Sequence, residues 1–357
     1  MADIIYNSPD LLRVGHGLPV RVNCSIGVPN QEALAQEISK IKAISANSPA
    51  PDLMMDLSTS LTEPEPWEII RENFGGPVGI LPHYTIYCES TGISSSQLMR
   101  RIEQVICQGV NFITIHPTPT RDLFEKARLS RAIPITSRGG NMILRDILIN
   151  KRQRNIYAEL FDDICALAFD TGAVLNLGTA FRASAVVDGL DDIVRDELAI
   201  QSEFLSRARQ AGVRVVLEGP GHVPLSQLET YTRSIRSLDV ISMPLGPIVT
   251  DCFDKADHIS SAIGAAYLMK LTRGGIINAI TSVEHRGGIP NLKQLQEGLL
   301  AAHVAAQAAT LSYNNEAFAN EEVICRTRGQ IQSCVITASA PGCARCQPFC
   351  PLIESKY

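Results

Sequence analysis

One alternation runs through most of this chain and limits the folds it can adopt. Short apolar runs rich in β-branched residues are each followed by a segment with helical periodicity. These runs occupy residues 20–27, 52–58, 78–84, 112–117, 133–138, 173–178, 214–219, 239–245 and 274–280. Strands that are apolar on both faces belong to parallel sheets covered by helices. The alternation therefore predicts an α/β protein.

Two of the intervening segments carry clear helix signals. In residues 94–110 a serine cap precedes a face formed by Leu98, Ile102 and Val105, and Gly109 ends the pattern. The last long periodic segment has one apolar face, which consists of Leu292, Leu295, Leu299 and Ala302. We expect a helix in each segment.

Polar and glycine residues directly follow almost every apolar run. Those sites are Ser58 and Thr59, His83 and Tyr84, His116, residues 137–140, residues 218–222, and Glu284 with His285. A barrel gathers its chemistry at the carboxyl ends of its strands, because the βα loops converge on one mouth. The pattern favours a (β/α)8 TIM-type barrel over a doubly wound sheet. The sequence contains nine such runs, whereas the barrel has eight strands, so one run lies outside the barrel or is not a strand.

The alternation stops near residue 312. We predict a (β/α)8 catalytic barrel over residues 1–312 and a C-terminal segment over residues 313–357 that binds an iron–sulfur cluster. A segment this short does not form its own core without help.

Charge and hydropathy exclude two classes of partner. The 32 Lys and Arg residues against 37 Asp and Glu give a net charge of −5 without a basic block, which argues against a nucleic-acid partner. No apolar run approaches 18 residues, and the N-terminus lacks the features of a signal peptide. We expect a cytoplasmic protein that contacts no membrane.

Three of the ten cysteines are crowded near the C-terminus. Cys343, Cys346 and Cys350 have C-x2-C-x3-C spacing, so their thiolates can converge on one metal centre. A structural zinc site would need a fourth ligand, which Cys325 or Cys334 would supply. Three ligands alone suit a [4Fe–4S] cluster with one iron open to a further ligand. The spacing favours iron–sulfur over zinc, with a group of reduced thiols as the third alternative.

Two histidines follow apolar runs of the predicted barrel. His222 lies in EGPGHVP and His285 in SVEHRGGIP, and Glu218 and Glu284 precede them. A single histidine of this kind is more often a hydrogen-bonded structural residue. Two imidazoles at the mouth of one barrel can share a divalent metal whose other positions stay open to water or substrate.

The SRGG motif at residues 137–140 suggests a phosphate site. It offers a hydroxyl, a guanidinium and backbone N–H groups, which are the usual phosphate ligands of a loop. The alternative is a simple glycine turn between a strand and a helix.

Six motifs taken together resemble one family. MDLST, SRGG, EGPGHVP, PLGPIVTD, DHISSAIGAA and the three-cysteine motif are similar to those of the ThiC family of noncanonical radical S-adenosylmethionine (SAM) enzymes, in order over nearly all of residues 20–350. The resemblance implies a (β/α)8 barrel with a C-terminal cluster loop. It also implies a homodimer in which the loop of one subunit closes over the partner's active site.

The activity implied by the resemblance is that of a carbon–carbon lyase. Such a lyase rearranges 5-aminoimidazole ribotide, a phosphorylated small molecule, to hydroxymethylpyrimidine phosphate for thiamine biosynthesis. A paralogue converts the same ribotide to 5-hydroxybenzimidazole for anaerobic cobamide biosynthesis. An electron from a donor such as ferredoxin or flavodoxin would cleave SAM at the cluster to a 5′-deoxyadenosyl radical, which starts the rearrangement.

The resemblance also assigns residues. It implies Cys343, Cys346 and Cys350 as [4Fe–4S] ligands, and His222 and His285 as ligands of a divalent Zn²⁺ or Fe²⁺. The ribotide-contacting residues would be Met55, Tyr84, His116, Ser137, Arg138, Gly139, Arg182 and Glu218, of which Glu218 is the catalytic residue.

The chain departs from the family pattern at four points. The family's cluster spacing is C-x2-C-x4-C, one residue longer than here, and Ser25, Thr179 and Met243 replace an Asn, an Asp and a Tyr. Loss of a buried hydrogen-bond partner costs ~1–3 kcal/mol, so a related ribotide is an alternative substrate. A non-catalytic barrel that binds a phosphorylated ligand and a zinc-dependent hydrolase are further alternatives. Three retained cysteines and two retained histidines favour the radical enzyme over both.

Overall fold

The computed structural model describes residues 3–9, 11–331, 333–334, 346 and 349. The chain divides into two compact units, Met1–Thr310 and Leu311–Tyr357.

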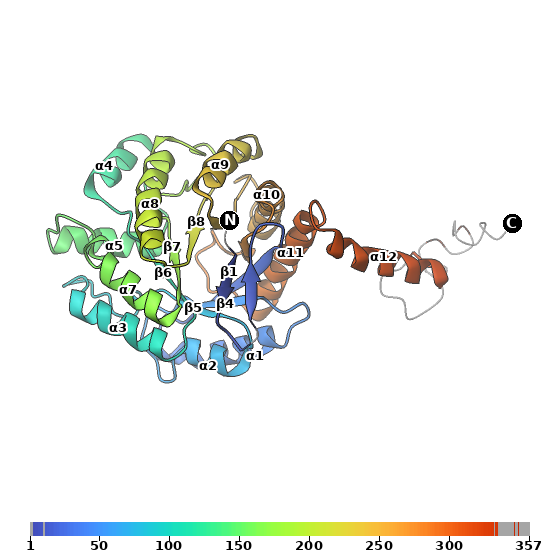
Figure 1. Ribbon diagram of the computed structural model, residues 1–357, viewed down its shortest axis with the longest axis horizontal. Helices are drawn as coiled ribbons and strands as arrows, with labels where there is room; N and C mark the ends of the chain where they lie inside the picture. Colours follow the sequence, from blue (N-terminus) through green and yellow to red (C-terminus); the bar gives the residue numbers. More distant parts are fainter. Residues whose placement is uncertain (1–2, 10, 332, 335–345, 347–348, 350–357) are drawn as a thin grey trace. The chain divides into compact units, whose positions relative to one another are not determined.

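Eight short parallel strands form the centre of the first unit (Figure 1). They are β3 (Arg21–Ile26), β4 (Leu53–Asp56), β5 (Val78–Ile80), β6 (Phe112–Ile115), β7 (Val174–Leu177), β8 (Val215–Glu218), β9 (Ile241–Met243) and β10 (Ile276–Asn278), in the order β10-β3-β4-β5-β6-β7-β8-β9. The two end strands β9 and β10 pack together, and the Asn278 side-chain N–H donates to the carbonyl of Pro244 at 2.8 Å. The sheet is a nearly closed barrel of the predicted TIM type.

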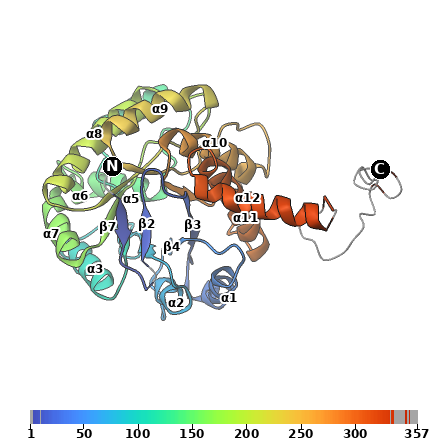
Figure 2. The ribbon, with the colours of Figure 1, turned by 45° about the vertical axis from the view of Figure 1, so that its right-hand side comes forward.

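Helices surround the strands, as Figures 1 and 2 show. They are α1 (Leu34–Ser45), α2 (Pro66–Asn73), α3 (Ser95–Cys107), α4 (Arg121–Ser130), α5 (Arg138–Ile149), α6 (Ile156–Glu159), α7 (Phe161–Thr171), α8 (Asp192–Gln210), α9 (Leu225–Leu238), α10 (Asp257–Thr272) and α11 (Leu292–Thr310), and the 3-10 turn η1 (Gln31–Ala33) precedes α1.

Both predicted helices are present. The predicted apolar residues of α3 are buried, and Gly109 follows the helix with φ +104°, a left-handed conformation that glycine adopts without strain. On α11 the buried side includes Leu295, Leu299 and Ala302. The apolar periodicity therefore identified the faces that these helices turn to the barrel.

The surplus ninth run is residues 133–138, which form no strand. Pro134 has no N–H to donate to a neighbouring strand. Ile135 packs instead against a small core that contains Phe181 and Ile193. Ser137 then caps α5, since its hydroxyl oxygen accepts a hydrogen bond from the N–H of Gly140 at 3.0 Å.

A short hairpin that the sequence analysis missed closes the amino end of the barrel. Its strands β1 (Ile4–Tyr6) and β2 (Leu12–Val14) are antiparallel, with Ile4 opposite Val14. Tyr6 meets the ring of Phe112 edge-on at 5.7 Å between centroids. The buried hairpin residues share one core with Leu53, Phe112, Val174, Val216, Ile241 and Ile276 of the barrel strands. This core fills the amino half of the barrel and leaves the carboxyl end for a site.

The second unit contains α12 (Asn315–Gln330). The helix begins at Asn314, whose side-chain oxygen accepts from the N–H of Ala317 at 3.2 Å. None of the sixteen residues of α12, all of which the structure describes, is buried. In the described part of the chain, no helix has the length and apolar character needed to cross a membrane.

Candidate functional site

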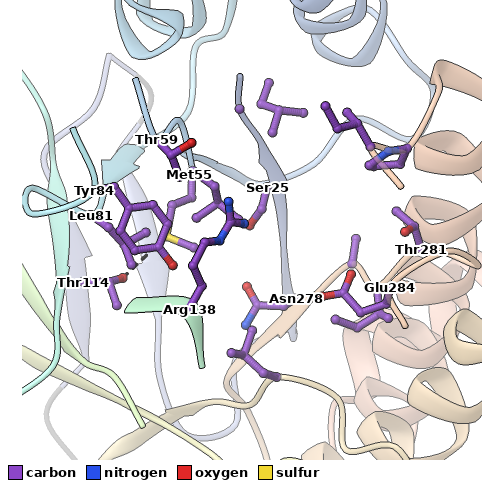
Figure 3. Close-up of a pocket in the computed structure, with 18 of the residues that line it drawn as sticks. Ser25, Met55, Thr59, Leu81, Tyr84, Thr114, Arg138, Asn278, Thr281 and Glu284 are labelled. Carbon is purple, nitrogen blue, oxygen red and sulfur yellow. Dashed lines mark hydrogen bonds between the residues drawn. The ribbon is translucent and has the colours of Figure 1, made fainter. Parts of the chain in front are cut away.

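A cavity of about 390 Å³ lies at the carboxyl ends of the barrel strands (Figure 3). Its lining includes most of the predicted ribotide-contacting residues, namely Met55, Tyr84, His116, Ser137, Arg138, Arg182 and Glu218. Gly139 lies behind this wall, in the first turn of α5. A Cβ at Gly139 would come within 2.6 Å of the His116 ring, so only glycine lets the helix approach this closely.

One side of the cavity carries an available positive charge. Arg138 is the first residue of α5, and its guanidinium carbon lies 5.2 Å from the centre of the Tyr84 ring. Among the described residues, no carboxylate forms an ion pair with Arg138. Figure 3 shows Arg138 and Tyr84 beside each other on the cavity wall. A cation held against an aromatic face at a helix N-terminus suits a phosphate group.

Two buried histidines support this wall without adding charge. His83 is fully buried, and its Nδ1 lies 2.8 Å from the hydroxyl of Tyr157. The Nε2 of His116 lies 3.2 Å from the Ser137 hydroxyl. Burial lowers the pKa of His83 to about 3 and holds the pKa of His116 well below its usual value. Both rings are therefore neutral at pH 7 and act as hydrogen-bonding groups.

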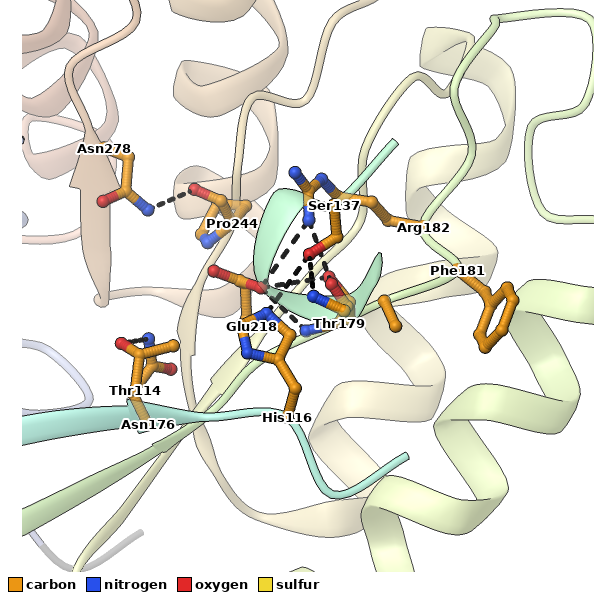
Figure 4. A network of polar contacts seen from close by, with 12 residues as sticks. Thr114, His116, Ser137, Asn176, Thr179, Phe181, Arg182, Glu218, Pro244 and Asn278 are labelled. Carbon is orange, nitrogen blue, oxygen red and sulfur yellow. Dashed lines mark hydrogen bonds and ion pairs between the residues drawn. The ribbon is translucent and has the colours of Figure 1, made fainter. Parts of the chain in front are cut away.

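A buried carboxylate lies at the end of β8. The N–H and hydroxyl of Thr179 donate to Oε2 of Glu218 at 2.7 and 3.2 Å, and the Arg182 guanidinium lies 3.9 Å from the same oxygen. Figure 4 shows these contacts converging on one oxygen while the other points away. Burial raises the pKa of Glu218, whereas Arg182 and Thr179 act in the opposite direction.

Helix α8 holds the segment that carries Thr179 and Arg182. Glu197 accepts hydrogen bonds from the N–H groups of Ala180 and Phe181 at 2.7 and 2.8 Å, and from the hydroxyl of Thr118 at 2.6 Å. Burial raises the pKa of Glu197 to about 7. No sequence pattern singles out this residue, because an acidic residue on a long charged helix resembles a solvent-exposed one.

His222 and His285 form a pair beside the cavity, although neither lines it. Their Nε2 atoms lie 3.2 Å apart. Two nitrogens bound to one tetrahedral zinc at about 2.05 Å would lie about 3.3 Å apart, so this separation fits a shared ion. Within the described residues, no group of three or more His, Cys, Asp or Glu side chains forms a metal site. An ion held by the pair would keep open positions.

Each of these rings is supported by a carboxylate. Asp251 lies 2.6 Å from Nδ1 of His222, and Asp257 lies 3.2 Å from Nδ1 of His285. Such carboxylates fix the tautomer and orientation of metal-binding histidines. The sequence analysis did not single out these aspartates. Asp251 is the last residue of PLGPIVTD, and Asp257 is the first residue of DHISSAIGAA.

Two of the three residues that depart from the family pattern belong to the site. Ser25 lines the cavity, and its hydroxyl accepts from the Asn23 amide at 3.2 Å. Thr179 contacts Glu218, as described above. Met243 is 1% exposed and belongs to the barrel core.

Two further charged residues on the cavity wall were missed by the sequence analysis. Glu37 and Lys40 lie on α1, and both are buried. Their spacing along the helix matches that of an ordinary surface ion pair, so the pattern did not distinguish them.

Of the three predicted cluster ligands, one lies among the residues that the structure describes. Cys346 is half-buried, whereas Cys343 and Cys350 lie outside the described residues. Their role stays a prediction from the spacing and the resemblance. The alternative zinc ligands Cys325 and Cys334 are both exposed.

Comparisons with known proteins show what the whole chain is similar to. A family model described as the radical SAM ThiC family matches residues 3–347. The chain is 32% identical to the 5-hydroxybenzimidazole synthase BzaA of Moorella thermoacetica, over 96% of this chain and 86% of that protein. It is 35% identical to a phosphomethylpyrimidine synthase of Saccharolobus islandicus, over 85% of this chain and 71% of that one. For the phosphomethylpyrimidine synthase of Pyrococcus furiosus the identity is 32%, over 89% and 76%.

Proposed function

The chain belongs to the radical SAM ThiC family, and from that premise we propose that it rearranges 5-aminoimidazole ribotide to hydroxymethylpyrimidine phosphate in thiamine biosynthesis. Membership implies SAM and an iron–sulfur cluster as cofactors. The observation that supports a ribotide best is Arg138 at the N-terminus of α5, which forms no ion pair with a carboxylate of the described residues and lines the same cavity as the carboxylate of Glu218. The cavity volume is within the usual range for small-molecule sites.

A second product is favoured by one observation. The similarity to the 5-hydroxybenzimidazole synthase of Moorella thermoacetica covers 96% of this chain. The similarity to the phosphomethylpyrimidine synthase of Saccharolobus islandicus covers 85%. Ser25 and Thr179 also change the polar contacts around the cavity. The alternative proposal is therefore formation of 5-hydroxybenzimidazole, or reaction of a related ribotide, from the same starting geometry.

The residues of the cavity have separate tasks in this proposal. Ser137, Arg138 and the α5 N-terminus bind the phosphate. Glu218 accepts a hydrogen bond from an amine or hydroxyl of the ribotide, and Thr179 and Arg182 hold that carboxylate in place. Met55, Leu81 and Tyr84 form an apolar wall that excludes water from the reacting centre.

The cofactors complete the proposal. Cys343, Cys346 and Cys350 would hold a [4Fe–4S] cluster, which with SAM supplies a 5′-deoxyadenosyl radical when reduced by a ferredoxin or flavodoxin. His222 and His285 would hold Zn²⁺ or Fe²⁺, and their 3.2 Å separation fits that role. We also propose a homodimer, as the resemblance implies.

The deciding experiment is turnover in vitro. Anaerobically reconstituted, reduced protein is incubated with SAM and 5-aminoimidazole ribotide. We expect 5′-deoxyadenosine above the ribotide-free rate and hydroxymethylpyrimidine phosphate by mass spectrometry. Hydroxybenzimidazole instead would support the alternative product. If an intact cluster is present and the ribotide neither binds nor stimulates cleavage of SAM, both assignments are wrong.

Replacing Arg138 with methionine should raise the KM for the ribotide about 10- to 100-fold. The change keeps an unbranched apolar stem and removes charge-assisted hydrogen bonds to phosphate, each worth ~1.5–3 kcal/mol. Steady-state kinetics measures the effect. Arg145→Met is the matched control, because Arg145 lies on the same helix with its side chain 47% exposed. Equal effects of both substitutions would contradict the phosphate role.

Replacing either histidine of the pair should remove one divalent ion per chain. Two imidazoles supply all the protein ligands proposed for this ion, so His222→Ala or His285→Ala leaves a single ligand. Anomalous diffraction at the metal edge should show a peak between the rings in the unaltered protein and no peak at that position in either variant. His16→Ala, at an exposed histidine, is the control. No peak in metal-replete crystals of the unaltered protein would refute the site.

A further inference from the structure

The cavity wall contains a buried ion pair that the proposed chemistry does not use. Glu37 and Lys40 are 3% and 5% exposed, and the Lys40 ammonium lies 2.5 Å from Oε2 of Glu37. Removing two charges from water costs free energy that their attraction often fails to recover. A stabilising role therefore explains the pair poorly. The hydrogen bonds that each member makes to other parts of the barrel suggest a different role.

The two members of the pair contact different parts of the barrel. Oε1 of Glu37 accepts a hydrogen bond from the N–H of Gly27, just after β3, at 3.1 Å. The ammonium of Lys40 donates to the carbonyl of Pro290 at 3.1 Å. Pro290 lies in the segment 279–291, which joins β10 to α11. Of these two side chains, Lys40 is the one that contacts this segment.

That segment brings functional groups to the cavity. Glu284 lines the wall, as Figure 3 shows, and the next residue is His285. The segment is tied near its middle, because Asp257 accepts from the N–H of His285 and contacts its ring.

Between Arg286, whose guanidinium pairs with Asp254, and Pro290 the chain has little packing of its own. A Cβ at Gly287 or Gly288 would have no neighbour within 4 Å, and Gly287 has φ +72°. Ile289 is 58% exposed. Such a stretch restrains its neighbours weakly. The hydrogen bond from Lys40 to Pro290 is therefore the restraint that α1 adds near the C-terminal end of segment 279–291.

We infer that Lys40 is a positioning residue, whose hydrogen bond to Pro290 fixes the end of segment 279–291 against α1 and so holds Glu284 and His285 at the cavity. Glu37 neutralises the buried ammonium and links it, through the hydrogen bond from Gly27, to the end of β3. For its catalytic consequence the inference rests on the proposed function, but the placement of the segment is measurable without turnover.

Three variants separate positioning from stability. Lys40→Met removes the contact to Pro290 and leaves a buried carboxylate, whereas Glu37→Gln removes the charge of the partner and keeps the contact. The double variant Glu37→Gln/Lys40→Met carries no buried charge at the pair, so its stability should exceed that of Lys40→Met. Chemical denaturation of the full chain ranks the stabilities.

Hydrogen exchange reports on the segment itself. The N–H groups of Glu284 and Arg286 donate to the carbonyls of Thr281 and Val283, so they are protected while the segment keeps its shape. We expect exchange at residues 284–286 to be at least tenfold faster in Lys40→Met and in the double variant. In Glu37→Gln it should change less than threefold.

The outcomes are distinguishable from failure of the proposed function. The expected exchange pattern supports the positioning role even if the unaltered protein turns over no ribotide. If the unaltered protein does turn over the ribotide, the two variants that lack Lys40 should also show a tenfold weaker affinity for Co²⁺ at the histidine pair. Unchanged exchange in Lys40→Met, or an equal increase in Glu37→Gln, would overturn the inference.

Discussion

Replacing Cys346 with alanine is expected to abolish the cluster of the reconstituted protein and reduce turnover below detection. Three thiolates hold the proposed [4Fe–4S] cluster, and the loss of one leaves two ligands for four irons. Iron and sulfide analysis should fall from one cluster per chain to none. The electron paramagnetic resonance signal of the reduced cluster should disappear with it.

A matched substitution separates iron–sulfur from zinc. Cys325 is exposed on α12 and is one of the residues that would complete a four-cysteine zinc site. We expect Cys325→Ala to keep the cluster and the activity. An unchanged cluster in Cys346→Ala, or one zinc per chain that is lost in Cys325→Ala, would show that the iron–sulfur assignment is wrong.

The second large effect is expected from Glu218→Gln, which should lower kcat/KM about 100-fold or more. The N–H and hydroxyl of Thr179 both donate to Oε2, so the glutamine amide has to turn its oxygen toward Thr179. Its NH2 group then faces the cavity, where the carboxylate offered an acceptor. The ligand's donor loses a hydrogen bond to a charged group, which is worth ~1.5–3 kcal/mol, and meets another donor instead.

Kinetics and stability together test this exchange of acceptor for donor. Glu229→Gln is the control, because Glu229 is an exposed residue of α9 whose carboxylate contacts the hydroxyl of Tyr267. We expect both variants to unfold within a few degrees of the unaltered protein. A change of less than threefold in kcat/KM for Glu218→Gln would remove Glu218 from the proposed mechanism.

Sequence patterns predicted the barrel because its strands β4 to β10 are buried on both faces. The same reasoning failed at residues 133–138, where Pro134 and the cap at Ser137 outweigh three β-branched residues. It also missed β1 and β2, since neither is followed by a helix and the alternation that marks the barrel strands is absent there. Apolar content indicates burial, but it does not say which hydrogen bonds a segment makes.

The candidate site was predictable where topology alone decides position. Residues at the end of a strand or directly after it, such as Glu218 and His116, converge because parallel strands end at one mouth. Residues that reach the site from helices, such as Lys40 and Glu197, were not predictable. On a helix, a charged residue that turns inward and one that faces solvent obey the same periodicity, and only the packed structure separates them.

The hairpin at the amino end of the barrel also bears on the order in which reactants bind. Because Tyr6 and its neighbours fill that end, the cavity communicates with solvent through its carboxyl-end mouth. Among the described residues, this mouth is the opening that the core leaves, so two molecules that bind in the cavity together would share it. We expect the one that binds deeper to arrive first and depart last, and an excess of the outer one to trap the inner one.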